Sequence, residues 1–217
     1  MKSAAFFDVD GTLINAFTQN VLAKLMMKRG FFSFAQSTQI FTWFLLYKLG
    51  LFTNSVEIRR NVYRVFGKQS KEKIDQLFSD ANQRILAEHL RDSMRTVVEQ
   101  HRRQGDMIIA VSGSLTALCK PICEQYAIDK LYATELISEN GKYTGAWKGV
   151  LLEGKNKADL IKKVAGEGHI DLIHSTAYAD SYSDVPMLEI VGDPAVVSPD
   201  PKLRNLAQRK GWRILAG

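Results

Sequence analysis

The chain of 217 residues has room for one large domain or for a core domain with an insertion, and its 46% hydrophobic and 24% charged residues are those of a soluble globular protein. A formal net charge of +6 favours anionic partners, such as phosphate esters, nucleic acid or acidic lipid headgroups, without choosing among them. The two cysteines, Cys119 and Cys123, lie in a predicted helix, which favours buried thiols in a reducing compartment over a metal-ligand cluster.

The first predicted element is the stretch Ala4–Ile14. It begins as a short apolar run, which predicts a buried strand, and the strand must stop at Gly11. Asp8 and Asp10 stand at its carboxyl end, where open α/β sheets place their ligands. Two like charges this close raise a pKa or bind a cation, so the full pattern D-x-D-G-T favours function over a simple Asp-Gly turn. The same acids interrupt the N-terminal apolar run, so no secretory signal is visible and a cytoplasmic location is predicted.

The chain from about Phe17 to Arg103 predicts a series of helices, because apolar residues recur at helical spacing and glycines separate the runs. Within it, the segment 30–47 carries no charge and has to be tested as a membrane span. Polar residues interrupt the segment, so we expect no transmembrane span but a helical hairpin packed on the rest of the protein. An apolar wall over a pocket and contact with a membrane surface are the alternatives.

Strands and helices alternate in the second half of the chain, which predicts a mainly parallel sheet. Buried strands are predicted at Met107–Val111 and at His174–Ala179. The helical block before them is most simply an insertion that caps the carboxyl edge of the sheet. The predicted domains are an α/β core formed by residues 1–14 and 104–217 and a helical cap formed by residues 15–103.

Polar residues follow these later strands. Ser112 ends the second strand, and its hydroxyl with the backbone N–H groups of Gly113 and Ser114 suits either an anion at a helix start or a simple N-cap. Asp180 and Asp184 follow the third strand, where the alternatives are helix capping in a solvated loop and a shared acidic site. With Asp8 and Asp10, Asp180 would make an oxygen-rich site suited to magnesium.

Four separated motifs resemble the haloacid dehalogenase-like (HAD) superfamily, whose usual activity is magnesium-dependent hydrolysis of phosphate esters. The motifs, in the family's order, are Asp8-Val9-Asp10-Gly11-Thr12, Val111-Ser112-Gly113-Ser114, Lys157, and Asp180 with Asp184. The implied fold is α/β, a Rossmann-like HAD core with a mainly parallel sheet and an inserted all-helical cap that resembles the family's C1 cap. The segment Gly141–Gly145 makes the chain most similar to the phosphoserine phosphatase-like branch, subfamily IB.

The resemblance implies a role for each motif residue. Asp8 is the nucleophile that forms an aspartyl-phosphate, and Asp10 protonates the leaving oxygen and then deprotonates the attacking water. The phosphoryl oxygens are held by Ser112, Gly113 and Lys157, with Thr12 nearby. Lys157 is preferred to Lys155 because the residues that follow it match the family. An anionic nucleophile attacking an anionic phosphate needs such fixed donors, which agrees with this assignment.

The resemblance also implies a magnesium cofactor. The Mg²⁺ ion would be held by Asp8, the main-chain carbonyl of Asp10 and Asp180, and Asp184 would orient Lys157 or metal-bound water. Oxygen ligands of this kind are those that Mg²⁺ prefers. The predicted site therefore contains both a cation and a lysine to offset the charge of the phosphate.

Some positions depart from the phosphoserine phosphatases. Phe17 stands where those enzymes have a glutamate that helps to bind the serine moiety, and Ser114 and Ser183 replace a glycine and an asparagine. The expected cap arginine has three candidates, Arg59, Arg60 and Arg64. Catalysis is compatible with these changes, whereas phosphoserine as the substrate does not follow from the sequence. Phe17 is a candidate for the substrate pocket and favours an uncharged or apolar leaving group.

We therefore expect a magnesium-dependent phosphomonoester hydrolase whose substrate is a small phosphorylated metabolite or a lysolipid phosphate. The alternatives are phosphoserine phosphatase proper, a phosphotransferase or mutase, and a non-enzymatic module that binds a membrane or a partner protein. No nucleic acid partner is expected, because basic clusters such as Arg102-Arg103 have no aromatic stacking platform beside them. The sequence makes no prediction of an oligomeric state.

Overall fold

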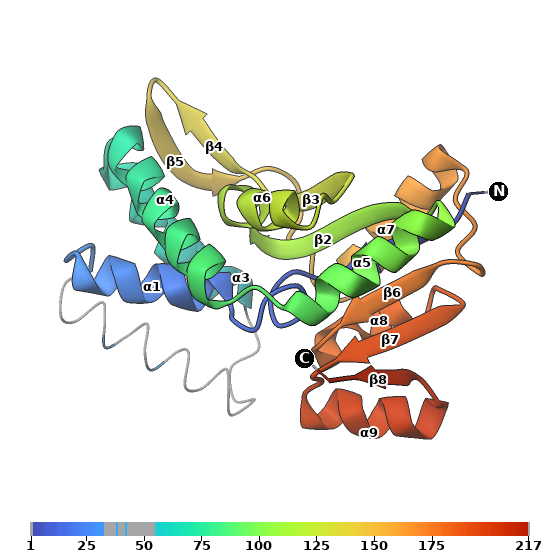
Figure 1. Ribbon diagram of the computed structural model, residues 1–217. Coiled ribbons are helices and arrows are strands. Elements are labelled where there is room, and N and C mark those ends of the chain that lie inside the picture. The colour runs from blue at the N-terminus through green and yellow to red at the C-terminus, as the bar shows by residue number, and fades with distance from the viewer. Residues whose placement is uncertain (1, 33–37, 39–41, 43–54, 217) are drawn as a thin grey trace.

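The computed structural model describes residues 2–32, 38, 42 and 55–216, and a six-stranded sheet lies at its centre (Figure 1). The strands of this sheet are β1 (Ala4–Phe7), β2 (Met107–Leu115), β3 (Lys130–Thr134), β6 (Thr176–Ala179), β7 (Asp193–Val197) and β8 (Arg213–Leu215). Their order is β3-β2-β1-β6-β7-β8, and each neighbouring pair is parallel. The predicted mainly parallel α/β fold is confirmed.

The central strand β1 is buried on both faces, as a parallel sheet covered by helices requires. Successive side chains on a strand point to opposite faces, so Ala5 and Phe7 join one apolar cluster while Ala4 and Phe6 join the other. The ring of Phe7 stacks on the ring of Tyr178 in the neighbouring strand β6, with 4.7 Å between the centroids. The apolar run thereby fixes the position of the residues that follow it at the carboxyl edge.

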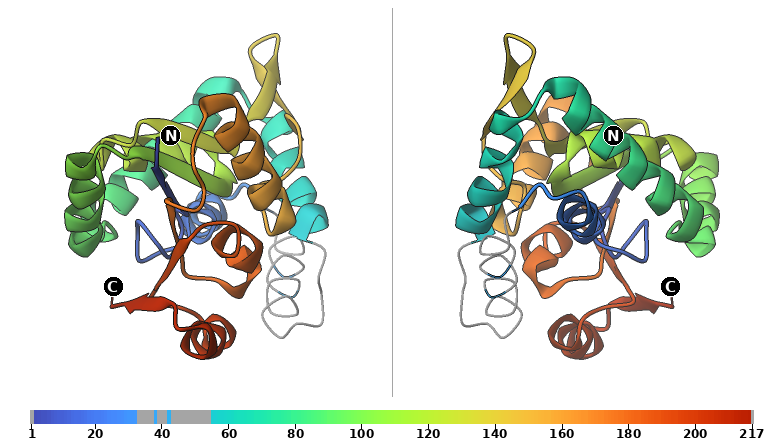
Figure 2. Two further views of the ribbon diagram at one scale, coloured as in Figure 1. Left: turned by 90° about the vertical axis from the view of Figure 1, so that its right-hand side faces the viewer. Right: turned by 90° about the vertical axis from the view of Figure 1, so that its left-hand side faces the viewer.

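Helices cover both faces of the sheet. They are α5 (Asp92–Gln104) and α6 (Thr116–Gln125) on one face, and α7 (Lys155–Gly168), α8 (Val185–Leu188) and α9 (Pro201–Lys210) on the other. Figure 2 shows α5, in green, and α7, in light orange, on opposite sides of the strands. Each carboxyl strand end therefore leads into a loop at the same edge, which is where ligands bind in sheets of this type.

The regular elements that the structure describes between β1 and β2 are helices, as predicted. Besides α5, they are α1 (Thr18–Lys28), α3 (Ser55–Arg64), the 3₁₀ helix η1 (Phe66–Lys68) and α4 (Lys71–Glu88). Leu22 and Met26 of α1 and Ile74 of α4 belong to a third apolar cluster, separate from the two clusters on the sheet. Phe31 and Phe32, at the start of the uncharged segment 30–47, are buried in the same cluster.

Most of the segment 30–47 lies outside the described residues, and so does the helical hairpin expected there. Among the residues that the structure does describe, we find no helix of the length and hydrophobicity needed to cross a bilayer. The boundaries 15–103 of the cap remain a prediction. Within them, α5 packs against β1 and β2, and its residues Met94 and Val98 belong to an apolar cluster of the sheet that also contains Ile85 of α4.

A β-hairpin joins the sheet domain to the helical insertion. Its strands are β4 (Leu136–Glu139) and β5 (Lys142–Trp147), connected at Asn140-Gly141, a dipeptide typical of two-residue hairpin turns. The hydroxyl of Tyr143 donates a hydrogen bond to Asp75 of α4 at 2.6 Å. Gly145 has a φ of +82°, and a Cβ at this position would lie 2.9 Å from the carbonyl oxygen of Tyr63. The hairpin backbone therefore rests directly on the backbone of α3.

We expect Gly145→Ala to destabilise the protein more than the matched control Gly149→Ala. Both glycines have positive φ angles, +82° and +67°, so an alanine at either would carry a backbone strain of about 1–2 kcal/mol. At Gly145 the new methyl group would in addition collide with α3, whereas nothing lies within 4 Å of Gly149. Urea unfolding of both variants measures the difference. Equal losses of stability would contradict the close docking of the hairpin.

Candidate active site

Asp8 and Asp10 follow the carboxyl end of β1, and each makes a different set of hydrogen bonds. The backbone N–H of Asp8 donates to the carbonyl of Tyr178 at 2.9 Å, which continues the pairing of β1 with β6. Asp10 accepts hydrogen bonds from the backbone N–H of Thr18 at 2.7 Å, from its hydroxyl at 3.2 Å, and from the hydroxyl of Ser114. The Asp10 carboxylate is thus fixed at the first turn of α1.

Gly11 allows the backbone after β1 to lie directly against the side chain of Asp180. Its φ is +74°, and a Cβ on this residue would lie 2.1 Å from Oδ2 of Asp180. Any side chain at this position would therefore displace Asp180, which follows β6. The glycine of the D-x-D-G-T pattern has a steric function here, because it leaves space for the third carboxylate.

Lys157 links the carboxylates through its ammonium group. It lies in the first turn of α7, and its Nζ is 2.6 Å from Oδ1 of Asp8 and 2.9 Å from Oδ1 of Asp184. The residue is buried, whereas Lys155 is exposed to solvent. Burial lowers the pKa of Lys157, but the charges of Asp184 and Asp8 outweigh burial and raise this pKa above its usual value. Lys157 therefore carries its positive charge in the site.

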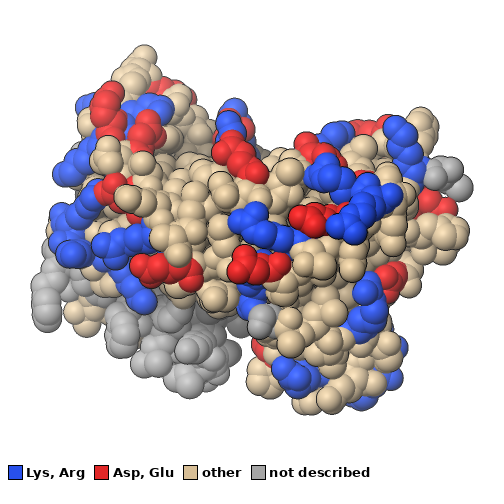
Figure 3. Space-filling view, in the orientation of Figure 1, with Lys and Arg blue, Asp and Glu red and all other residues tan. Residues whose placement is uncertain are grey.

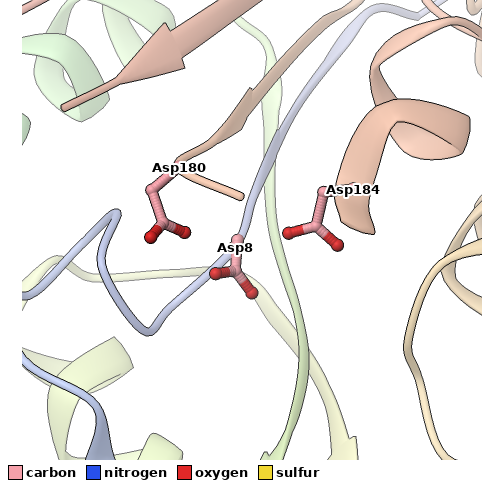
Figure 4. A group of neighbouring side chains, drawn as sticks. All are labelled: Asp8, Asp180 and Asp184. Atoms are coloured by element: carbon pink, nitrogen blue, oxygen red, sulfur yellow. The ribbon is translucent and has the colours of Figure 1, made fainter. Parts of the chain in front are cut away.

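Three carboxylates gather around the end of β1. Asp8, Asp180 and Asp184 each offer an oxygen atom within 4.8 Å of the others, and Figure 4 shows the three side chains converging. Burial, followed by the charge of Asp184, raises the pKa of Asp180 to about 7. Burial likewise raises the pKa of Asp8, although Lys157 opposes it. Carboxylates crowded in this way bind a proton or a cation, and an all-oxygen donor set fits a hard divalent cation such as Mg²⁺.

Ser112 and Gly113 line the same cavity as these carboxylates. The strand β2 does not end at Ser112 as predicted but continues to Leu115, with an irregular register after Val111. The hydroxyl of Ser112 accepts a hydrogen bond from the backbone N–H of Ser114 at 3.0 Å, and the residue is buried. The N-cap of α6 is Leu115 and not Ser112, so simple capping does not account for this serine.

The site residues predicted from the sequence meet around one cavity of about 370 Å³, with one exception. Those that line it are Asp8, Asp10, Phe17, Ser112, Gly113, Lys157, Asp180 and Asp184. Thr12 is fully buried, its hydroxyl has no hydrogen-bond partner among the described residues, and it does not line the cavity. Asp184 belongs to the acidic cluster itself, in addition to its contact with Lys157.

Sequence reasoning missed Thr18 and Glu153, and it named Ser114 and Arg59 without giving either a settled role in the site. Thr18 and Ser114 orient the carboxylate of Asp10, and no sequence pattern pointed to the first of them. Arg59 of α3, one of three candidate cap arginines, lines the cavity and pairs with Glu153 from the loop before α7. No sequence pattern pointed to Glu153, because its position in the site depends on how the helical insertion packs against the sheet domain.

Comparisons with known proteins identify the family of the chain. The family model of the haloacid dehalogenase-like hydrolases matches residues 5–189. A histidinol-phosphatase from Neisseria meningitidis serogroup C is 27% identical over 220 residues, which are 99% of this chain and 99% of that protein. A phosphoserine phosphatase from Mycobacterium tuberculosis is 28% identical over 217 residues, which are 99% of this chain and 70% of that protein.

Solved structures share the fold. A protein of unknown function from Bordetella pertussis Tohama I has a TM-score of 0.87 at 23% identity, with 99% of this chain and 98% of that chain covered. A phospho-aspartyl intermediate analogue of phosphoserine phosphatase has a TM-score of 0.72 at 20% identity, with 99% and 93% covered. The chain belongs to the haloacid dehalogenase-like hydrolases. It is thus a hydrolase of the family that the motifs of the sequence predicted, and the two relatives named above are phosphatases.

We expect magnesium to stabilise the folded protein, because a bound cation relieves the repulsion among the three carboxylates. At a concentration of 100 times Kd, a ligand adds about 2.7 kcal/mol, which corresponds to a rise in Tm of roughly 5–10 °C for a chain of this size. Asp180→Asn should reduce the shift, whereas Asp159→Asn, on the exposed side of α7, should retain it. Scanning calorimetry with and without MgCl₂ measures both. Equal shifts in the two variants would contradict a cation site at Asp180.

Proposed function

We propose that this protein is a magnesium-dependent phosphomonoester hydrolase that works through an aspartyl-phosphate on Asp8. The observation that carries the proposal is the buried contact of Asp8 with Lys157 at the end of β1, surrounded by Asp180 and Asp184. A carboxylate nucleophile is useful against a phosphate only where positive charge offsets the repulsion between them. The site combines the nucleophile with a lysine and with a donor set for a cation.

In the first half of the proposed reaction, a carboxylate oxygen of Asp8 attacks phosphorus and the P–O bond to the leaving alcohol breaks. Lys157 and Ser112 of β2 hold the phosphoryl oxygens. Burial raises the pKa of Asp10, which favours the protonated carboxyl that must give its proton to the leaving oxygen. Thr18 and Ser114 keep the Asp10 carboxyl in one orientation for this transfer.

In the second half, Asp10 removes a proton from a water molecule and the oxygen of that water attacks phosphorus. The bond between phosphorus and Asp8 breaks, inorganic phosphate leaves, and both acids return to their starting states. A Mg²⁺ ion held by Asp8, Asp180 and the main-chain carbonyl of Asp10 would supply positive charge to the phosphoryl oxygens. Asp184 would position Lys157, which it contacts at 2.9 Å.

The proposed substrate is a small phosphorylated alcohol. The cavity of about 370 Å³ has room for a compact phosphate ester. The relatives named histidinol-phosphatase and phosphoserine phosphatase support a substrate of this size. Phe17 lines the cavity and is 52% exposed, so an apolar ring occupies the place where the phosphoserine phosphatases have a carboxylate.

Asp8→Asn is expected to abolish the hydrolysis of p-nitrophenyl phosphate, since an amide cannot act as the nucleophile. Asp10→Asn should lower kcat by about 10²–10⁴-fold, the usual contribution of general acid–base catalysis. Steady-state assays with purified variants test both expectations, with circular dichroism as the folding control. Asp159→Asn should keep the wild-type rate. A turnover by Asp8→Asn close to that of the wild type would remove Asp8 as nucleophile.

Removal of the metal is expected to stop the reaction. Dialysis against excess EDTA should reduce the hydrolysis of p-nitrophenyl phosphate to background, and added MgCl₂ should restore it, because Lys157 alone cannot offset the charge of the phosphate and the acidic cluster together. Full activity after dialysis with chelator still present would contradict the magnesium dependence.

A further inference from the structure

A salt bridge crosses the cavity from the helical insertion to the sheet domain. The Nη2 atom of Arg59, on α3, contacts Oε1 of Glu153, and Nη1 of Arg59 donates a hydrogen bond to the carbonyl of Gly113. The side chains are 13% and 35% exposed, respectively, and both line the cavity. Neither residue belongs to the proposed catalytic steps.

The bridge lies directly over the strand end that is proposed to bind phosphate. A Cβ on Gly113 would be 3.1 Å from Cγ of Glu153 and 3.3 Å from Nη1 of Arg59. The backbone of Glu153 is fixed in turn by hydrogen bonds in the loop before α7, where its N–H donates to the carbonyl of Leu151 at 3.0 Å. A leaving alcohol that extends from a phosphoryl group at Ser112 toward α3 must therefore pass this pair.

The pair determines how much positive charge the cavity offers to the leaving group. Among the described residues that line the cavity, Lys157 and Arg59 carry the positive charges, and Lys157 is held by Asp8 and Asp184. Arg59 is therefore the group that a carboxylate on the substrate would bind. Glu153 already occupies it, and a substrate carboxylate that displaced Glu153 would leave two like charges side by side in a partly buried place.

We propose that Glu153 is a specificity-determining residue that occupies Arg59 and thereby excludes phosphate esters whose leaving alcohol carries a carboxylate. This inference rests on the proposed function, because it concerns the leaving group of the same reaction. Exclusion by a repulsive charge is a general means of specificity, since a site discriminates as effectively by an unfavourable contact as by a favourable one.

The test compares substrates that differ in one carboxylate. Phosphoserine is paired with phosphoethanolamine, and 3-phosphoglycerate with glycerol 3-phosphate, and the ratio of kcat/KM within each pair is measured. The wild type should prefer the carboxylate-free member of each pair. Glu153→Gln should shift both ratios toward the carboxylate-bearing member by about tenfold or more, the equivalent of one charge-assisted hydrogen bond to the released Arg59.

Two further variants separate specificity from a structural role of the salt bridge. In the double variant Arg59→Gln/Glu153→Gln, the shift toward the carboxylate-bearing esters should disappear, because the arginine that would bind the carboxylate is gone. Glu135→Gln, which removes a surface ion pair with Lys148, should leave both ratios at their wild-type values. The inference would be overturned if Glu153→Gln changed kcat/KM equally for both members of each pair, or if the wild type preferred the carboxylate-bearing esters.

A binding measurement keeps this inference distinct from the proposed function. Calorimetric titration of the same four esters into Asp8→Asn, with and without Glu153→Gln, needs no turnover. Failure of the wild type to hydrolyse p-nitrophenyl phosphate with magnesium would overturn the proposed function alone. Tighter binding of phosphoserine relative to phosphoethanolamine in the Glu153→Gln background would support the exclusion, and an unchanged ratio of the two Kd values would contradict it.

Discussion

The contact of the Lys157 ammonium with the carboxylates of Asp8 and Asp184 is the interaction on which the site depends. It joins the ends of β1, α7 and the 3₁₀ helix η2 (Tyr182–Asp184), which are far apart in the sequence. Burying these charges costs free energy that their mutual attraction only partly returns, so the arrangement is weak evidence for a role in stability. A cluster with more negative than positive charge is instead what a site for a cation and a phosphoryl group requires.

The helical insertion contacts residues beside this cluster through polar groups at two points. Thr18, at the start of α1, binds the carboxylate of Asp10, and Arg59, on α3, binds the carbonyl of Gly113. The β4–β5 hairpin makes a further contact with the insertion, where the backbone of Gly145 lies against α3. On the face shown in Figure 3, basic side chains lie among acidic ones. Surface ion pairs such as that of Lys210 with Glu189 balance some of the basic side chains. The unusual concentration of charge is inside the cavity rather than on this face.

Much of the site could be predicted because local patterns encode it. An apolar run followed by acids places Asp8 and Asp10 at a strand end. Parallel strands bring their carboxyl ends to one edge of the sheet, so the motifs at Ser112 and Asp180 are expected beside them. The Arg59–Glu153 pair could not be predicted, because docking of the insertion brings together residues that are 94 positions apart. The burial of Thr12 was missed for a related reason, since the sequence does not reveal that the turn after β1 directs this side chain away from the cavity.

The central claim is that the phosphoryl group passes through a covalent bond to Asp8. Acid quenching of the enzyme during turnover of an aryl phosphate, followed by reduction with borohydride, converts an acyl phosphate to an alcohol. Peptide mass spectrometry should then find homoserine in place of Asp8, and this product should be absent without substrate. Efficient turnover with no reduced residue at position 8, or with the reduced residue at Asp10 or Asp180 instead, would contradict the account.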